Sequence, residues 1–296
     1  MSAGARRRRE WLTFLVFAGP NLILFGVFTY WPTLYNAYLS LTDWNLIAAH
    51  PTFVGLENYS ELFTSAEFWR VAANTLIYAI CVVVSAQIIA FGLALLLNGP
   101  VLGRGVFRTL AFTPYVTTTA AAALAWVLLL DPGLGPLSGV YHMIGVDGPD
   151  LLRSGTGSLA AIIIVGSWKE IGFATIFFLA GLQVIDRSLR ESASLEGAGA
   201  WAQTRFITFP LMTPVIFFLG LAGFIAALKT FDSVYMMTEG GPVYPDSSTY
   251  VFHLYKTAFR DFRAGLASAF AVIFFVLTVL MTGVQFRLAR RWVHYE

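Results

Sequence analysis

Charged side chains lie within two otherwise apolar segments of the chain. Lys169 and Glu170 fall near the middle of the run 158–182, and Lys229 and Asp232 stand at the end of a second run. A charge inside a segment that crosses a bilayer costs about 2.5–3.5 kcal/mol at mid-span, so such a side chain usually faces a cavity or a partner. Lys169 and Glu170 project about 100° apart on a helix, which predicts that each has a partner other than its neighbour.

No catalytic or metal-binding pattern accompanies these charges. The four histidines are scattered, without H-E-x-x-H spacing, and the single cysteine, Cys81, lies in an apolar run. The chain also lacks the G-x-x-x-x-G-K-[ST] loop that cradles ATP phosphates. We therefore expect no catalytic residues, no metal site, no ATP hydrolysis by this chain and no cofactor bound to it.

The composition indicates that lipid is the solvent for much of the chain. Of 296 residues, 57% are hydrophobic and 12% are charged, with a mean hydropathy of +0.69, whereas soluble proteins carry about 25% charged residues. A span needs roughly 20 apolar residues. We expect one all-α membrane domain over 12–287, without internal repeats. Its six spans are predicted at about 12–31, 71–97, 107–130, 158–182, 211–231 and 265–287.

The basic residues predict the orientation of these spans. Arg6 to Arg9 precede the first span, which has no clear A-x-A cleavage site and so reads as an uncleaved anchor. With the N-terminus inside, 12 Lys and Arg residues fall on the inner side and 5 on the outer side. This bias predicts an N-in, C-in protein. The tails 1–11 and 288–296 and the loop 183–210 would then be cytoplasmic.

The loops on the outer side are long, at about 32–70, 131–157 and 232–264, and rich in aromatic and turn residues. Tyr and Trp near span ends usually form an interfacial belt. The alternative is that this outer surface receives another protein.

The cytoplasmic loop 183–210 has the pattern of two short helices. Ser188-Leu189-Arg190-Glu191 forms a capping box that predicts a helix start. Gly197 and Gly199 let that helix end or bend, and a second helix follows from about Ala200. Pro210 ends the second helix or opens the next span. We predict a helix–turn–helix on the cytoplasmic face; an amphipathic linker resting on lipid headgroups is the alternative.

The spacing Glu191-x-Ala193-x3-Gly197-x9-Ile207-x-x-Pro210 resembles the EAA loop of binding-protein-dependent ABC importer permeases. Ser192 and Phe209 depart from the pattern but stay small and apolar, respectively. In that family the loop forms coupling helices that sit in a cleft of the ATPase subunit. The resemblance implies coupling roles for Glu191, Ser192, Ala193, Leu195, Glu196, Gly197, Ala198, Gly199, Arg205, Ile207 and Pro210.

Four further motifs, in the same order as in the family, extend the resemblance over nearly the whole chain. They resemble segments of the sugar and glycerol-phosphate permeases: Phe53-Val54-Gly55-Leu56-Glu57-Asn58-Tyr59, Gly103-Arg104-Gly105-Val106-Phe107-Arg108, Phe178-Leu179-Ala180-Gly181-Leu182-Gln183, and Thr238-Glu239-Gly240-Gly241-Pro242 with Gly265-Leu266-Ala267-Ser268-Ala269. The chain is thus identified as resembling the carbohydrate-importer group.

This resemblance implies a function and a set of partners. A permease of this kind imports a sugar or sugar derivative by alternating access in a bacterial or archaeal plasma membrane. It works as a heterodimer with a second permease, with two ATP-binding subunits that hold ATP and Mg inside and a solute-binding protein outside. No nucleic acid is expected. The sequence does not name the sugar.

The resemblance also implies a substrate path, because in the family these parts of the spans face the translocation route. A sugar offers hydroxyls to polar groups and a ring face to aromatic side chains. The predicted path residues are Trp168, Lys169, Glu170, Phe173, Lys229, Thr230, Phe231 and Asp232. The alternatives are that the charges pair between helices or with the partner permease, and that Lys229 snorkels to the interface.

Two other classes of function remain open at this point. A secondary transporter driven by an ion gradient is one, although inverted repeats and broken helices are not visible in the sequence. A scaffold that moves nothing is the other.

Overall fold

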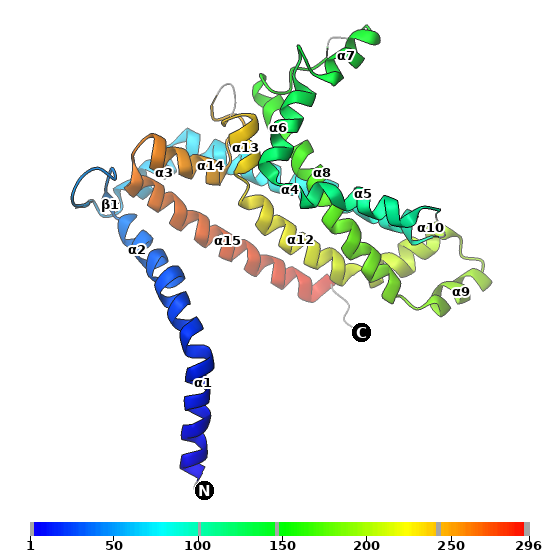
Figure 1. Cartoon of the computed structure of the whole chain (residues 1–296), viewed down its shortest axis with the longest axis horizontal. Coiled ribbons are helices and arrows are strands. Elements are labelled where there is room, and N and C mark those ends of the chain that lie inside the picture. The colour runs from blue at the N-terminus through cyan, green and yellow to red at the C-terminus, as the bar shows by residue number, and fades with distance from the viewer. Residues whose placement is uncertain (1–2, 100–101, 146–147, 241–243, 293–296) are drawn as a thin grey trace. The chain divides into compact units, whose positions relative to one another are not determined.

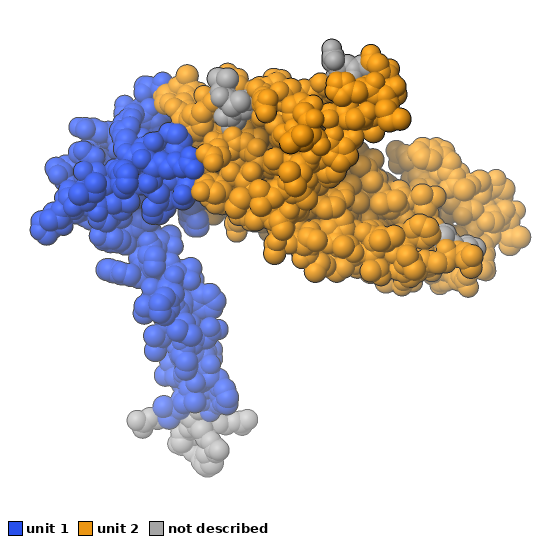
Figure 2. Space-filling model, turned by 45° about the horizontal axis from the view of Figure 1, so that its top comes forward, with its two compact units in different colours: residues 1–64, 254–276 blue, residues 65–253, 277–296 orange. Residues whose placement is uncertain are grey.

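The computed structural model describes residues 3–99, 102–145, 148–240 and 244–292 and is helical almost throughout (Figure 1). The motif residues Gly241 and Pro242 lie outside these ranges. The chain divides into two compact units (Figure 2). Unit 1 comprises Met1–Thr64 and Leu254–Val276, and unit 2 comprises Ser65–His253 and Leu277–Glu296.

Unit 1 begins with one long continuous helix. It consists of α1 (Ala3–Phe25), a π-helical turn η1 (Gly26–Tyr30) and α2 (Trp31–Leu39). Pro32 follows the π-helical turn and lacks the N–H that the preceding α-helical turn would need, which explains the local widening. The apolar helix therefore continues beyond the predicted span 12–31 to Leu39.

The rest of unit 1 is a small cap on the predicted outer side. Two short antiparallel strands, β1 (Thr42–Asp43) and β2 (Thr52–Phe53), are the exception to the all-α prediction within the described ranges. The buried Asn58 donates to the carbonyls of Ser40 at 3.0 Å and Thr42 at 2.9 Å. The unit is completed by α3 (Glu57–Thr64), η3 (Lys256–Arg260) and the start of α15 (Ala264–Trp292).

Two long helices form the centre of unit 2, as the sequence predicted. They are α4 (Ala66–Asn98), capped by Ser65, and α8 (Gly155–Val184), capped by Ser154. The two helices pack along each other, and α12 (Thr213–Leu228) contacts both (Figure 1). A buried apolar cluster that includes Ala90, Phe178, Leu182, Met212 and Leu219 fills the space among them.

The third predicted span is not a single helix, which corrects the expectation that no helix is broken. It consists of α5 (Arg104–Val116) and α6 (Thr119–Leu130), bent by 101°, because Thr117 and Thr118 are extended at the junction. The pair Ala200–Leu211 and Thr213–Leu228 also bends, by 63°. That bend lies where the predicted loop 183–210 meets the fifth predicted span, and α12 within that span is one helix.

Shorter helices complete unit 2, and the last of them, α14, continues into unit 1. The loop 183–210 contains α9 (Arg187–Leu195), α10 (Ala200–Gln203) and a π-helical turn η2 (Thr204–Thr208), and α11 (Phe209–Leu211) follows. The predicted outer loops carry α7 (Pro136–Met143), α13 (Asp232–Met237) and α14 (Tyr250–Tyr255).

The described residues contain four helices long and apolar enough to cross a membrane, or up to six spans if each bent pair counts as one. The predicted class, an all-helical membrane protein with six spans, is consistent with this count. The N-in, C-in orientation and the limits of the two tails stay predictions.

The contact between α8 and α5 generates a stability prediction. A Cβ added to Gly172 would lie 2.4 Å from the carbonyl oxygen of Ala111, so Gly172→Ala should lower the free energy of unfolding by about 1–3 kcal/mol. Thermal melting in detergent measures this. Gly92→Ala in α4 is the matched control, because its Cβ would meet nothing within 4 Å. Equal melting temperatures for the two variants would contradict the close packing.

The bidentate ion pair of Arg263 with Glu61, at 2.6 Å for both contacts, generates a pH prediction. The hydrogen bonds from Arg263 lower the pKa of the Glu61 carboxyl below the ordinary glutamate value of 4.5. The stabilisation is therefore present above pH 4.5 and is lost as the pH falls through the folded pKa. Both side chains are about half exposed, so Glu61→Gln should cost only about 0.5 kcal/mol at pH 7. Melting curves of the two proteins should converge below pH 4.5; a constant difference would contradict the pairing.

Candidate functional site

A cavity of about 260 Å³ lies in unit 2, among α4, α6, α8, α12 and residues 229–233. It brings together two segments that are about 60 residues apart in the chain. Six of the eight predicted path residues line it: Lys169, Glu170, Lys229, Thr230, Phe231 and Asp232.

The other two predicted path residues, Trp168 and Phe173, do not line this cavity. The ring of Trp168 packs edge-on against Trp126 of α6 at 5.7 Å, and Phe173 stacks on Tyr115 of α5 at 4.8 Å. These two rings are thus used to hold α8 against its neighbours.

Lys169 holds the break between α5 and α6. The break leaves the backbone carbonyl of Thr117 with an extended residue after it, and the ammonium of Lys169 donates to that oxygen. Asp232 also attracts this ammonium. A backbone carbonyl that has left the helical hydrogen-bond ladder is satisfied by such a donor. Lys169 therefore has the partner outside its own helix that the sequence predicted, and this partner is a backbone group.

Glu170 differs from Lys169, because it has no hydrogen bond or ion pair within the described part of the chain. Its carboxylate lies beside α12, where a Cβ added to Gly223 would be 3.4 Å from Oε1. The side chain is partly buried, whereas Lys229 and Asp232 are exposed. The cavity thus contains a carboxylate to which the described residues form neither a hydrogen bond nor an ion pair, although Tyr78 lies within electrostatic reach.

Tyr78 also lines the cavity, although it is not among the residues predicted from the sequence. Its hydroxyl accepts a hydrogen bond from Thr230 Oγ1 at 3.3 Å. Asn74 is a polar residue inside the predicted span 71–97, and Tyr78 lies four residues later on the same helix face. That spacing was the available signal. Thr119, Gly223 and Ser233 also line the cavity.

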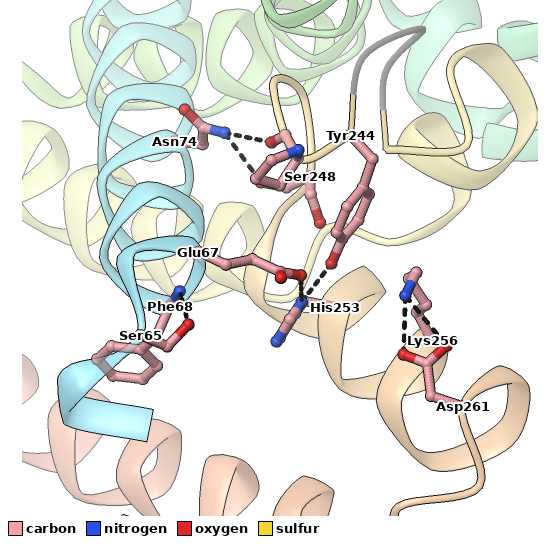
Figure 3. Close-up of polar contacts among 10 residues, drawn as sticks. Ser65, Glu67, Phe68, Asn74, Tyr244, Ser248, His253, Lys256 and Asp261 are labelled. Carbon is pink, nitrogen blue, oxygen red and sulfur yellow. Dashed lines mark hydrogen bonds and ion pairs between the residues drawn. The ribbon is translucent and has the colours of Figure 1, made fainter. Parts of the chain in front are cut away.

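Asn74 itself holds the segment that follows the cavity residues. Its amide donates to the carbonyls of Pro245 at 2.9 Å and Asp246 at 3.1 Å. It also donates to the carbonyl of Ser248 at 3.3 Å (Figure 3). In the same segment, Thr249 Oγ1 donates to the carbonyl of Thr230 at 3.0 Å. The segment is thereby tied both to α4 and to a residue that lines the cavity.

Side chains at the start of α4 add to this attachment. Arg70 forms an ion pair with Asp246, and Nδ1 of His253 lies 3.3 Å from Glu67 Oε1 (Figure 3). The end of unit 2 at which α4 begins is therefore held together by several polar contacts to that helix.

The first helix of the loop 183–210 begins two residues earlier than the sequence predicted. Asp186 is the N-cap of α9 and accepts from the backbone N–H of Ser188 at 3.0 Å. The predicted Ser188 capping box is therefore wrong, because Ser188 already lies inside the helix. The hydrogen bonds from Ser188 lower the pKa of the Asp186 carboxyl, which keeps a negative charge at the helix N-terminus.

Gly197 forms the corner of the loop, as predicted. Its φ of +84° lies in the left-handed region. The N–H of Gly197 bonds to Ser194 O at 3.1 Å, and that of Ala198 bonds to Ala193 O at 2.9 Å. This pair of bonds is a Schellman motif. Gln203 then donates to both Ser194 Oγ and Ala198 O at 2.9 Å, which fastens the second helix to the first.

The loop presents apolar side chains to its surroundings. Leu195, Trp201 and Phe206 are 90%, 78% and 73% exposed, and none of the eleven predicted coupling residues is buried. A group of exposed large apolar residues marks an interaction surface. The helix–turn–helix is thus shaped to contact something outside this chain.

The loop joins the two helices that border the cavity. From Glu170 to Val184 at the end of α8 the distance along the helix is about 21 Å, and α12 runs from Thr213 back to Leu228, just before Lys229. A second cavity of about 580 Å³, lined mainly by apolar residues such as Val184, Leu211 and Met212, lies where the loop meets both helices. A displacement of the loop would act on both helices.

Within the described ranges, no three His, Cys, Asp or Glu side chains are placed to hold a metal ion.

Comparisons with known proteins identify relatives of the whole chain. The family model described as "Binding-protein-dependent transport system inner membrane component" matches residues 88–294. The chain is 31% identical over 281 residues to the sn-glycerol-3-phosphate transport system permease protein UgpA of Agrobacterium fabrum, covering 93% of this chain and 94% of that protein. It is 33% identical over 290 residues to the probable ABC transporter permease protein y4oQ of Sinorhizobium fredii, covering 95% and 92%.

The fold has a counterpart among solved structures. A chain of a bacterial alginate ABC transporter, crystallised in complex with an alginate pentasaccharide-bound periplasmic protein, matches with a TM-score of 0.84 at 23% identity. The match covers 98% of this chain and 97% of that chain. The similarity extends over the broken helices as well as the long ones.

The family match covers well over half of the chain, and the relatives match it nearly end to end. The chain therefore belongs to the binding-protein-dependent transport system inner membrane component family, and it is a multi-pass permease subunit of an ABC importer rather than an enzyme.

Proposed function

We propose that this permease carries a sugar or a sugar derivative, delivered by an extracytoplasmic solute-binding protein, by alternating access. The observation that best supports this is the cavity, because hydroxyl, ammonium and carboxylate groups from α8 and from residues 229–233 converge on it. Such groups suit a ligand rich in hydroxyls. The relatives named for sn-glycerol-3-phosphate and for alginate point to the same broad class.

Three further subunits would assemble with this chain, one of them in the membrane and two on its cytoplasmic side. A second permease would complete the translocation path, and two ATP-binding subunits would hold ATP and Mg and receive the loop 183–210. The exposed side chains of Leu195, Trp201 and Phe206 support the ATPase contact. The helix Glu10–Leu39 has none of its apolar window buried, which leaves it available to lipid and to the second permease.

ATP binding would close the ATP-binding subunits and draw the coupling helices of the two permeases together. Because the loop continues directly into α8 and α12, this movement would rotate both helices and open the cavity outward. Hydrolysis would reverse the change. In this mechanism the segment from Glu191 to Pro210 is the lever, and the cavity residues bind the cargo during the change of access.

The broken helices give one reason to test a second candidate, a secondary transporter, since interrupted helices occur at the binding sites of such proteins. Proteoliposomes that contain the complete complex and its binding protein separate the two. ATP-dependent sugar uptake that is lost without the ATP-binding subunits is the expected result. Uptake that continues without them, driven by an ion gradient, would contradict the proposal.

The corner of the lever gives a direct mutational prediction. Gly197→Asp adds charge and bulk at a left-handed position on the docking surface. We expect uptake to fall at least about tenfold, the effect of about 1.4 kcal/mol of lost coupling free energy. A Cβ at residue 197 meets nothing within 4 Å, so the substitution strains only the left-handed backbone of the corner itself, and membrane insertion should persist.

Gly99→Asp is the matched control for this variant. Gly99 has an extended φ of −75°, and an added Cβ would be 3.6 Å from its nearest neighbour, Leu96 O. Uptake by this control should stay near the wild-type rate. If Gly197→Asp transported at the wild-type rate too, the coupling role of the loop would be refuted.

A further inference from the structure

The cavity is lined by equal numbers of positive and negative side chains, but these side chains are not equally free to contact a bound molecule. Two lysines, Lys169 and Lys229, face two carboxylates, Glu170 and Asp232. Lys229 and Asp232 are exposed, three residues apart in the chain, whereas Lys169 and Glu170 are partly buried. The charge that a bound molecule meets therefore depends on whether Lys169 or Glu170 is free to interact with it.

Lys169 already interacts with other groups of its own chain. Its ammonium donates to the backbone carbonyl of Thr117 at the helix break and is attracted by Asp232. If an anionic ligand took this ammonium, the backbone carbonyl of Thr117 would lose the hydrogen bond that Lys169 donates to it, and that loss would offset part of the gain from binding the anion. Lys169 is thus poorly placed to neutralise a phosphate or a carboxylate of the cargo.

Glu170 is the opposite case. Within the described part of the chain, no donor or cation pairs with its carboxylate, which lies against the side-chain-free position Gly223 on α12. An ionised carboxylate accepts hydrogen bonds and donates none. It therefore attracts hydroxyl or ammonium groups and repels other anions, and the repulsion is strong where water is scarce.

We propose that Glu170 is a specificity-determining residue that restricts the cargo to sugars or polyols without negative charge, including amino sugars. This inference rests on the proposed function, because it concerns the cargo of the same cavity. It separates the chain from relatives named for sn-glycerol-3-phosphate or alginate, which are anionic. At identities of 31% and 23%, a change of cargo charge is compatible with the shared fold.

The test uses the complete transporter in proteoliposomes, with its binding protein and ATP. An equimolar mixture of glucose, glycerol, glucosamine, glucose 6-phosphate, sn-glycerol 3-phosphate and glucuronate is supplied outside, and imported compounds are identified by mass spectrometry. Import confined to the neutral and amino compounds is the expected result. Import of either phosphate or of glucuronate would overturn the charge rule but leave the proposed function standing. If none of the six entered in an ATP-dependent manner, the proposed function would fall, and this inference with it.

Variants of Glu170 test the residue itself. Glu170→Gln should lower import of the wild-type cargo about tenfold, because a hydrogen bond to a charged group becomes one to a neutral group. It should also raise the ratio of anionic to neutral import at least about tenfold. Glu170→Asp should recover part of the neutral import without admitting anions. Glu57→Gln at the start of α3, an exposed carboxylate that does not line the cavity, is the control and should leave the ratio unchanged.

The ratio distinguishes specificity from structure. A merely structural role for Glu170 would reduce import of all compounds in proportion and leave the ratio constant. That result would overturn the assignment of Glu170, whatever the wild-type cargo is.

Discussion

The backbone carbonyl at the interrupted helix is the constraint on which the centre of unit 2 depends. Where α5 ends and α6 begins, the extended Thr117 and Thr118 remove a carbonyl from the helical ladder, which leaves that carbonyl in need of another donor. Lys169 supplies the donor from α8. Close contact at Gly172 brings α8 near enough to α5 for this bond. The break in turn places Thr119 at the cavity. The hydrogen bond from Lys169 to the Thr117 carbonyl therefore stabilises the break and also the position of a cavity residue.

The helix α8 also connects the cavity to the loop 183–210. α8 carries Lys169 and Glu170 and ends at Val184, after which the loop 183–210 leads back into α12 and on to Lys229. The loop is internally braced by the Schellman motif at Gly197 and by Gln203. A braced loop between two helices transmits displacement better than a slack one, because fewer dihedral angles can absorb it. Its exposed apolar side chains provide the contact through which a partner would move it.

Much of this could be predicted from the sequence, because apolar length and the distribution of arginines report directly on membrane crossing. The coupling motif could be recognised because its glycine is required by a left-handed corner, and the structure has φ +84° there. The breaks could not be predicted, since Thr117-Thr118 inside an apolar run does not by itself indicate extended backbone. The roles of Trp168 and Lys169 could not be predicted either. A sequence shows that a residue is aromatic or charged, but it does not show that Trp168 packs against Trp126 or that Lys169 donates to a backbone carbonyl.

The central claim is that movement of the loop changes access to the cavity. The most direct measurement is the rate at which an impermeant thiol reagent labels Ser233→Cys, a cavity residue, in the complete transporter with the free Cys81 replaced by serine. Trapping the ATP-binding subunits with ATP and vanadate should raise the labelling rate from the outer side. The substitution Gly197→Asp should abolish that increase. An unchanged ATP-dependent increase in the Gly197→Asp background would contradict the account, because access would then change without the lever.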